Sequence, residues 1–313
     1  MTRLTIPAIT NRPPMSERQT QSFLIQRMTE AGVRPQLQHG QNFLIDLNLL
    51  DLLVRTADLG PKDVVLEVGT GMGSLTGRMA QMVAGVVTVE IDPRLFALAS
   101  EELNGLANVT MLHQDALKNK NTIHPAVLEA VHHKLDAHPG RQLKLVANLP
   151  YNIATPILSN LLVVNPVPIS MTATIQKELA DRMVASPGTK DYSALSIWMQ
   201  SLCSIEIVRE MPPQVFWPRP KVHSAIIHIL PNPAKRAQLD DPSFFHDFVR
   251  SLFFHRRKFL RGVLASAFAD KLSKAEIDEL LGPFELPTDA RAEQLPVETL
   301  IALSKAVEHR LHR

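Results

Sequence analysis

The fold is decided by residues 64–76, which read VVLEVGTGMGSLT. The first five residues are a continuous apolar run with one acid, Glu67, which is typical of a buried parallel strand. Three glycines, Gly69, Gly71 and Gly73, follow directly, and a helical pattern then begins. A glycine-rich turn between a strand and a helix lets a ligand approach the backbone closely. The stretch therefore predicts an α/β fold with a cofactor site at the carboxyl end of this strand.

Two further apolar strands end in carboxylates where such a site needs them. Residues 86–89 lead into Glu90, 21 positions after Gly69, where an α/β fold places an acid to bind ribose hydroxyls. Residues 109–112 form the next predicted strand, and Asp115 follows it. We expect both acids to lie beside the glycine turn, because parallel strands end at one edge of the sheet.

The glycine spacing distinguishes two cofactor classes that use this layout. The dinucleotide fingerprint needs G-x-G-x-x-G/A, and counting from Gly69 its third small position is Ser74, an imperfect match. The alternating Gly69–Gly73 spacing after Glu67 instead resembles the S-adenosylmethionine-dependent methyltransferases. In that family an acid at the position of Asp115 hydrogen-bonds the adenine amino group of the cofactor.

A second motif, Asn148-Leu149-Pro150-Tyr151, follows the apolar run 143–147. An amide oxygen can accept a hydrogen bond from an exocyclic amine, and a tyrosine face can stack on the ring that carries it. The proline fixes φ and holds both groups at the strand end. An ordinary proline turn is the alternative, but the ordered set of strand-end motifs favours a site for a planar base.

Composition narrows the class of protein. The chain has 313 residues, 45% of them hydrophobic, which is enough for one large domain and a small one. No apolar run approaches the length of a membrane span. The single cysteine, Cys203, excludes an internal disulfide and favours a reducing compartment. We expect a cytoplasmic monomer that does not enter a membrane.

Positive charge is concentrated in one window. Residues 209–262 hold 10 basic and 4 acidic groups, a net charge of +6 (10 − 4), whereas the whole chain has a net charge of +2. A charge run can simply be a solvated face, but this one is interleaved with aromatic residues. The pattern favours a polyanion partner.

Four histidines gather in the linker 118–140 without forming a metal-binding pattern. They are His124, His132, His133 and His138. No cysteine or acid completes a known ligand spacing with them, so we expect a solvated helix there and no metal site.

We expect three parts along the chain. Residues 1–37 are an N-terminal extension, flexible or facing RNA, with a short helix over 19–31; an organelle transit peptide is the alternative, because the segment has several arginines and few acids. Residues 38–232 form the α/β domain, and residues 233–313 form a small all-helical domain. The boundary is placed at Pro231-Asn232-Pro233, which breaks the chain.

Periodicity predicts the remaining elements. One strand is expected over 169–175, and an antiparallel pair over 204–208 and 224–230. Helices are expected over 47–59, 92–104, 123–135, 176–185, 192–201, 242–254, 256–268, 274–281 and 297–309.

A proline-stiffened loop, residues 212–224, precedes the last predicted strand. Its four prolines restrict the chain and are expected to hold Phe216 outward. There Phe216 could form the second wall of a base slot opposite Tyr151. Core packing of Phe216 is the alternative.

These motifs together resemble one family, the small-subunit ribosomal RNA adenine N6-dimethyltransferases. The resemblance covers roughly residues 38–300, and the motifs follow one another in the same order as in the family. It rests on five stretches: Gln41-Asn42-Phe43-Leu44, the turn 67–76, Asn148 to Tyr151, the loop 212–224, and the basic segment 252–260.

The resemblance implies a Rossmann-like sheet with helices on both faces and a C-terminal helical domain. It also implies S-adenosylmethionine as cofactor and methyl transfer to N6 of two adjacent adenosines near the 3′ end of small-subunit (16S) rRNA, so that the partner is the small ribosomal subunit. It further implies site residues. The cofactor would be bound by Asn42, Leu44, Gly69, Glu90, Asp115 and Asn148, and the target adenine by Asn148, Tyr151 and Phe216.

The resemblance also assigns phosphate binding to Arg256, Arg257 and Lys258 on a basic helix, although a solvated helix face is the alternative. The sequence departs from the family in its long extension, its longer linker 118–140, and Gly262, where a polar residue is usual. None of these departures touches the proposed chemistry.

Four other functions share part of the pattern. A large-subunit rRNA methylase of the Erm resistance type usually has Ile at the position of Leu149, and a DNA adenine methylase commonly has Pro there. A nicotinamide oxidoreductase is disfavoured by Ser74 and by the lack of a Tyr-x-x-x-Lys pair. A non-enzymatic ribosome-assembly factor is disfavoured by the intact cofactor set.

Overall fold

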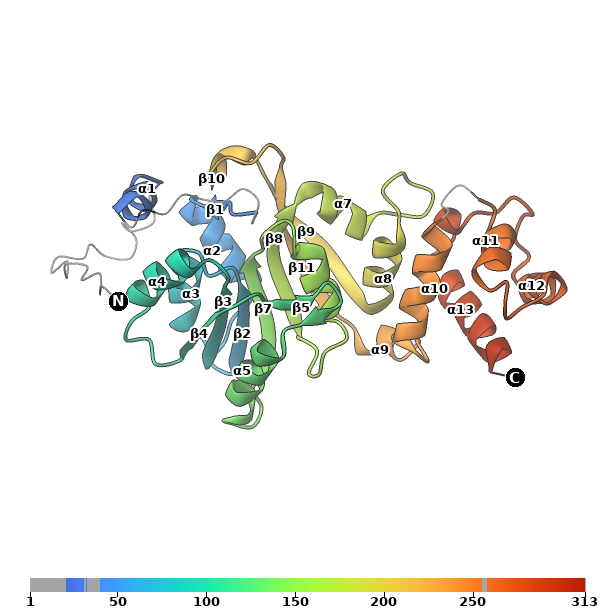
Figure 1. Cartoon of the computed structure of the whole chain (residues 1–313), viewed down its shortest axis with the longest axis horizontal. Helices are drawn as coiled ribbons and strands as arrows, with labels where there is room; N and C mark the ends of the chain where they lie inside the picture. The colour runs from blue at the N-terminus through green and yellow to red at the C-terminus, as the bar shows by residue number, and fades with distance from the viewer. Residues whose placement is uncertain (1–20, 31, 33–39, 255–257, 313) are drawn as a thin grey trace.

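A seven-stranded sheet lies at the centre of the chain (Figure 1). The computed structural model describes residues 21–30, 32, 40–254 and 258–312. In spatial order the strands are β4 (Val109–His113), β3 (Gly85–Glu90), β2 (Asp63–Val68), β7 (Gln142–Asn148), β8 (Ser170–Gln176), β11 (Ser224–Pro231) and β9 (Cys203–Met211).

The sheet is mixed rather than fully parallel. Strands β2, β3, β4, β7 and β8 pair in parallel, whereas β11 pairs antiparallel with both β8 and β9. The predicted α/β class and the antiparallel pair are therefore confirmed. The sequence did not predict that β11 would lie between β8 and β9.

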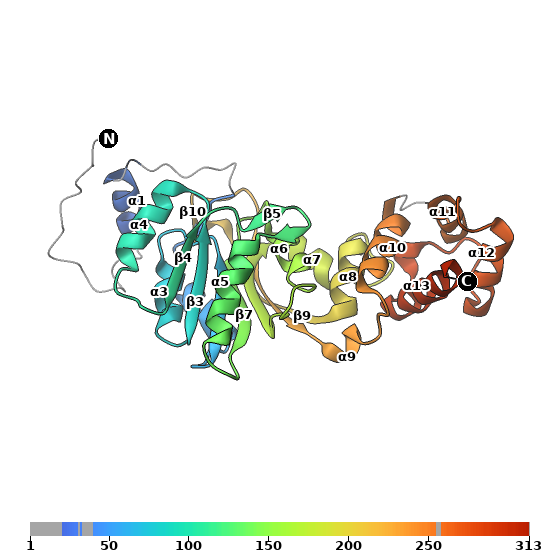
Figure 2. The ribbon, with the colours of Figure 1, turned by 60° about the horizontal axis from the view of Figure 1, so that its bottom comes forward.

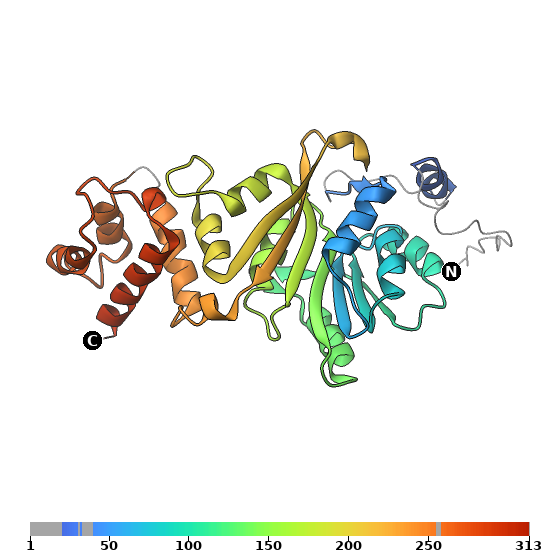
Figure 3. The ribbon, with the colours of Figure 1, turned by 180° about the vertical axis from the view of Figure 1, so that it is seen from behind.

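Helices cover both faces of the sheet, as expected. On one face, α2 (Leu47–Thr56) and α3 (Ser74–Ala80) pack over Val65, Val86 and Val146. On the other, α5 (Pro125–Asp136) packs over Leu66 and Val87, and buried side chains of α6 (Ala154–Asn160) and α7 (Lys177–Val184) belong to the same cluster. Figure 2 shows the face of the sheet that α5 and α6 cover. Figure 3, seen from behind, shows the opposite face, which α2 and α3 cover. Successive strand residues thus supply two separate hydrophobic layers.

Side-chain caps start two of the helices next to the site strands. Asp92 accepts hydrogen bonds from the backbone N–H groups of Arg94 and Leu95 at the start of α4 (Pro93–Glu102), with proline at the first position. This confirms the start predicted from Asp92-Pro93. Asp46 caps α2 in the same way.

Two short antiparallel pairs accompany the main sheet. Strand β1 (Phe43–Leu44) pairs with β10 (Phe216–Trp217), which follows the 3₁₀ turn η3 (Pro213–Val215). Strand β5 (Leu117–Asn119) pairs with β6 (Thr122–Ile123) in the linker. The predicted linker helix is present as α5, but it begins after His124, whose Nδ1 accepts from the N–H of Ala126 at 3.3 Å.

The C-terminal part of the described chain is helical and lies at one end of the molecule (Figure 1). Its elements follow α8 (Ala194–Leu202) and are α9 (Pro233–Arg236), α10 (Pro242–Phe254), α11 (Leu260–Ala267), α12 (Lys274–Leu281), η4 (Gly282–Phe284), η5 (Ala292–Gln294) and α13 (Val297–Leu311). Buried side chains of α8, α10 and α13 belong to the same cluster as the sheet. The domain boundary at residue 232 stays a prediction.

The continuous basic helix predicted over 256–268 is wrong. Helix α11 begins only at Leu260, and Lys258 and Phe259 lie outside any helix. The N–H of Leu260 donates to the carbonyl of Ala290 at 2.7 Å, which anchors this helix start from a distant part of the chain. Arg256 and Arg257 lie outside the described residues.

The described part of the extension is helix α1 (Gln21–Glu30), close to the helix expected over 19–31. It lies beside α4 (Figure 2). Among the described residues, no helix is long and apolar enough to cross a membrane. The same residues contain no group of three or more His, Cys, Asp or Glu placed to hold a metal ion.

Candidate active site

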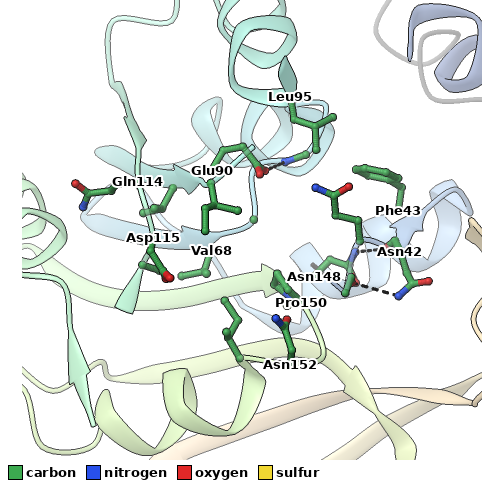
Figure 4. Close-up of a pocket in the computed structure, with 18 residues that line it drawn as sticks. Asn42, Phe43, Val68, Glu90, Leu95, Gln114, Asp115, Asn148, Pro150 and Asn152 are labelled. Atoms are coloured by element: carbon green, nitrogen blue, oxygen red, sulfur yellow. Dashed lines mark hydrogen bonds between the residues drawn. The ribbon is translucent and has the colours of Figure 1, made fainter. Parts of the chain in front are cut away.

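A pocket lies where β2, β3, β4 and β7 end (Figure 4). It contains five of the predicted site residues, namely Asn42, Gly69, Glu90, Asp115 and Asn148. The remaining lining residues are Gly40, Gln41, Phe43, Val68, Gly71, Val89, Ile91, Leu95, Gln114, Ala116, Pro150, Asn152 and Ile153.

The glycine turn forms the floor of this pocket because its backbone excludes side chains. Gly69 has φ +88°, and a Cβ there would lie 3.3 Å from the ring of Pro150. Gly71 has φ +58°, and its Cβ would lie 3.2 Å from the ring of Phe43. Positive φ disfavours any side chain at either position. The turn therefore presents bare backbone to a ligand, as a closely approaching cofactor requires.

Glu67 is buried behind the turn and does not line the pocket. Its Oε2 accepts from the hydroxyl of Thr88 at 2.7 Å and from the hydroxyl of Thr76. Thr88 also bonds the hydroxyl of Thr70 at 2.7 Å. Burial raises the pKa of Glu67 to about 8, although the two threonine hydroxyls oppose the shift. This network supports the glycine turn from behind, and the Glu67 side chain does not contribute to the pocket lining.

Glu90 and Asp115 present carboxylates from adjacent strand ends. Glu90 accepts from the N–H of Gly71 at 2.9 Å and from the N–H of Asp92 at 3.0 Å. Burial raises the pKa of Glu90. Asp115 accepts from the N–H of Leu117 at 2.9 Å and is exposed. A carboxylate has about four acceptor sites, so both can also bind ligand hydroxyl or amino groups.

The amide of Asn148 is oriented by the segment before β1. Its Nδ2 donates to the carbonyl of Asn42 at 2.8 Å (Figure 4). Asn42 in turn donates to the carbonyl of Gly40 at 3.2 Å. Since Nδ2 is the donor in this bond, the other end of the amide, Oδ1, is an acceptor for a ligand N–H. The structure thus brings Asn42 and Asn148 together, although they are far apart in sequence.

Tyr151 is half-buried just outside the pocket, next to the lining residues Pro150 and Asn152. Its hydroxyl hydrogen-bonds the hydroxyl of Ser224 at 2.6 Å. Burial raises the pKa of Tyr151, so the phenol stays neutral. The bond joins the Asn148–Tyr151 motif to the end of the proline loop, a contact that the sequence did not predict.

Besides Tyr151, two more predicted site residues, Phe216 and Leu44, do not line the pocket. Phe216 is only 2% exposed and packs in a hydrophobic cluster with Leu44 and Met211, so the expectation that the prolines hold it outward is wrong. The physical reason is the pairing of β1 with β10, which sets Phe216 opposite Leu44. Leu44 itself is 6% exposed in the same cluster.

Sequence reasoning missed Phe43, Gln114 and Asn152 as lining residues. Each of the three is the immediate neighbour of a predicted site residue. Proximity to a predicted site residue was therefore the signal in the sequence that could have indicated them. Phe43 stacks on Trp217 with ring centroids 6.3 Å apart, which places the proline loop against the pocket wall.

The lining residues fit S-adenosylmethionine. The bare glycine backbone leaves room for its methionine part, and Glu90 and Asp115 offer acceptors for ribose hydroxyls and an adenine amine. Apolar Ile91 and Ala116, which follow these two acids in the chain, also line the pocket.

Comparison with known proteins decides the family. The model of the ribosomal RNA adenine dimethylases matches residues 33–306. The chain belongs to this family. It is accordingly an rRNA adenine dimethyltransferase that depends on S-adenosylmethionine.

The sequences of curated relatives align with most of the dimethylase. Ribosomal RNA small subunit methyltransferase A of Halothermothrix orenii is 37% identical over 274 residues, which are 87% of this chain and 88% of the relative. The protein of the same name from Alkaliphilus metalliredigens is 40% identical over 274 residues, 87% of this chain and 91% of the relative.

Solved structures support the fold of the dimethylase. A dimethyladenosine transferase from Plasmodium falciparum has a TM-score of 0.71 at 22% identity, covering 85% of this chain and 97% of that one. The 23S rRNA methyltransferase ErmE has a TM-score of 0.59 at 24% identity, covering 85% and 100%. These likenesses confirm the Rossmann-like sheet with a helical C-terminal region.

A larger groove adjoins the cofactor pocket of the dimethylase and shares Asp115, Asn152 and Ile153 with it. The β5–β6 hairpin, α6, α9 and α10 contribute to its walls. Its basic residues are Lys118, Lys120, Arg236 and Arg250, and its acidic residues are Asp115, Asp241 and Asp247.

The basic residues of the segment 209–262 fall into two groups, those bonded within the fold and those exposed to solvent. Lys235 donates to the carbonyls of Gln200 and Cys203 at 2.9 and 2.8 Å, and Arg261 pairs with Asp278. These cations hold the fold together. Arg219, Lys221 and Arg250 are exposed and remain available to a polyanion.

The raised pKa of the buried Glu67 carboxyl leads to a prediction about how the stability of the fold depends on pH. The folded protein keeps this proton up to about pH 8, whereas the unfolded chain releases it near 4.5. Stability should therefore fall as pH rises between these values, by up to about 1.4 kcal/mol per pH unit. Glu67→Gln should remove this contribution.

Urea unfolding at about pH 6 and about pH 7.5 measures the effect. The stability of Glu67→Gln relative to wild type should rise by about 2 kcal/mol between the two pH values. The same pH slope in both proteins would contradict a proton held on buried Glu67.

Proposed function

We propose that the enzyme transfers methyl groups from S-adenosylmethionine to N6 of two adjacent adenosines. The target is a loop near the 3′ end of small-subunit (16S) rRNA, methylated during ribosome biogenesis. The observation that carries this proposal is the Asn148 amide, which lines the cofactor pocket, is oriented by the carbonyl of Asn42 and belongs to the same short motif as Tyr151. Relatives named ribosomal RNA small subunit methyltransferase A support the choice of subunit.

The cofactor supplies an electrophilic methyl group on a sulfonium centre. We assign the ribose hydroxyls to Glu90, the adenine amine to Asp115, and close backbone approach to Gly69, all of which line the pocket. We assign Asn42, which also lines the pocket, to its entrance. Because the side chain of Leu44 is buried, the cofactor binding expected of this residue is assigned to its backbone.

Asn148 prepares the target amine. The N6 lone pair is delocalised into the adenine ring, so the amine is a poor nucleophile. If Asn148 Oδ1 and a nearby carbonyl accept its two N–H groups, the nitrogen becomes pyramidal and its lone pair points at the methyl group. Pro150 O already accepts from the N–H of Ile153 at 3.1 Å, so we assign the second acceptor to Leu149 O.

Orientation and electrostatics then supply most of the rate. Orientation alone is worth effective molarities up to about 10⁵–10⁸ M, and the preorganised acceptors add electrostatic stabilisation. No strong base is needed, because the methylated amine becomes acidic and can lose its proton to water. For the second round, the pocket must admit a monomethylated amine.

Aromatic side chains hold the flipped base. Unstacking the target costs a few kcal/mol, and stacking on a side chain returns about 1–3 kcal/mol. Tyr151 is held for this role by Ser224. For Phe216 to form the second wall, its side chain must leave the buried cluster when the base enters.

The RNA strand is proposed to follow the groove next to the pocket. Lys118 and Lys120 on the hairpin and Arg250 on α10 are exposed along it and can bind phosphates. A loop adenosine is already partly unstacked, which favours a loop as the target. Lys258 remains a proposed phosphate contact, now from a loop rather than a helix.

The decisive experiment incubates the protein with labelled S-adenosylmethionine and small subunits that lack adenine dimethylation, and then maps the label. We expect N6,N6-dimethyladenosine at two adjacent positions. Label on large-subunit RNA or DNA instead would overturn the substrate and keep the cofactor. Tight subunit binding without any label would favour an assembly factor.

Asn148→Ala should lower methyl transfer by at least about 10²-fold, on the scale of removing one preorganised polar group. Binding of S-adenosylmethionine, measured by calorimetry, should change by less than about threefold, because the pocket keeps its other lining residues. Asn104→Ala, an exposed asparagine beyond α4, is the control and should leave both unchanged. Equal loss of binding and transfer would count against the role of Asn148.

Phe216→Leu keeps apolar volume in the cluster but removes the aromatic face. If Phe216 stacks on the base, kcat/KM for small subunits should fall about 5- to 150-fold, since stacking is worth about 1–3 kcal/mol. The midpoint of thermal unfolding should change little. A variant that melts at lower temperature yet methylates normally would restrict Phe216 to packing.

A further inference from the structure

The extension reaches the cofactor site through one buried side chain. Met28 of α1 is 1% exposed and packs with Leu95 and Leu98 of α4. Phe43, Met72 and Trp217 pack against the same cluster, which is separate from the two larger hydrophobic layers of the sheet. Segments from five parts of the chain therefore meet at this one point.

Two members of this cluster are also walls of the cofactor pocket. Leu95 and Phe43 both line it. The Phe43 ring lies between the backbone of Gly71 and the ring of Trp217, so it has little freedom while the cluster is complete. Met28 lies in the cluster without lining the pocket itself.

Polar contacts fix α1 in this place. Arg27 Nη2 lies 3.2 Å from Glu101 Oε2 on α4. Arg94, near the start of α4, donates to the carbonyl of Gly32 at 2.9 Å. The helix is therefore attached to α4 by an ion pair and a buried side chain, and Gly32 just after it by a hydrogen bond.

We infer that α1 is a positioning element of the cofactor site, in which Met28 holds Leu95 and Phe43 against the space that S-adenosylmethionine occupies. This rests on the proposed assignment of the pocket to that cofactor. Truncating Met28 removes packing atoms behind both walls, and a cavity there lets the two side chains move away from the ligand. The extension thus contributes to cofactor affinity without touching the cofactor.

The test measures S-adenosylmethionine binding by calorimetry on the full chain without RNA. Met28→Ala should raise the Kd about tenfold, whereas Met28→Leu should restore it to within about twofold of wild type, because leucine refills the volume. KM for small subunits at saturating cofactor should be unchanged. Ile277→Ala, at a buried position of α12, is the matched control. It should lower the melting temperature without changing the Kd.

A charge swap keeps the inference falsifiable if Met28→Ala does not fold. Arg27→Glu and Glu101→Arg should each raise the Kd by about threefold, and the double variant should bind as wild type does. Folded variants of either kind with wild-type Kd would overturn the inference. Failure of the proposed function would appear differently, as wild-type protein that binds the cofactor but methylates no adenosine.

Discussion

Two backbone positions without side chains let the separate segments of the active site meet. Gly69 lies against Pro150 and Gly71 against Phe43, so close that a Cβ would lie only 3.3 Å and 3.2 Å from the two rings. The end of β2, the Asn148–Tyr151 motif and the segment before β1 can therefore converge on one pocket. A side chain at either glycine would be strained by the positive φ and would press on the neighbouring segment.

Hydrogen bonds then decide how the converging groups point. A half-buried amide such as that of Asn148 needs partners, and the Asn42 carbonyl satisfies its NH₂ end. The hydroxyl of Tyr151 is held by Ser224 in the same manner. The orientation proposed for catalysis is thus set before substrate arrives, which is the condition for electrostatic preorganisation.

Short-range patterns predicted much of this arrangement. The Asp92-Pro93 start of α4 and the acids at the ends of β3 and β4 follow from local propensity and strand length. The helix predicted over 256–268 failed because local apolar spacing says nothing about distant partners. Leu260 takes its backbone partner from Ala290, and the guanidinium of Arg291 lies 5.8 Å from the ring centre of Phe259.

The sequence by itself determined the α/β class, the cofactor class and the edge of the sheet where the site lies, because strand runs, glycine turns and caps are encoded over a few residues. Only the tertiary structure decided that Phe216 faces inward and that Met28 stands behind the cofactor pocket. Both outcomes depend on pairing between segments far apart in the chain, β1 with β10 and α1 with α4. The free energy of burying a side chain depends on those partners, which no local pattern specifies.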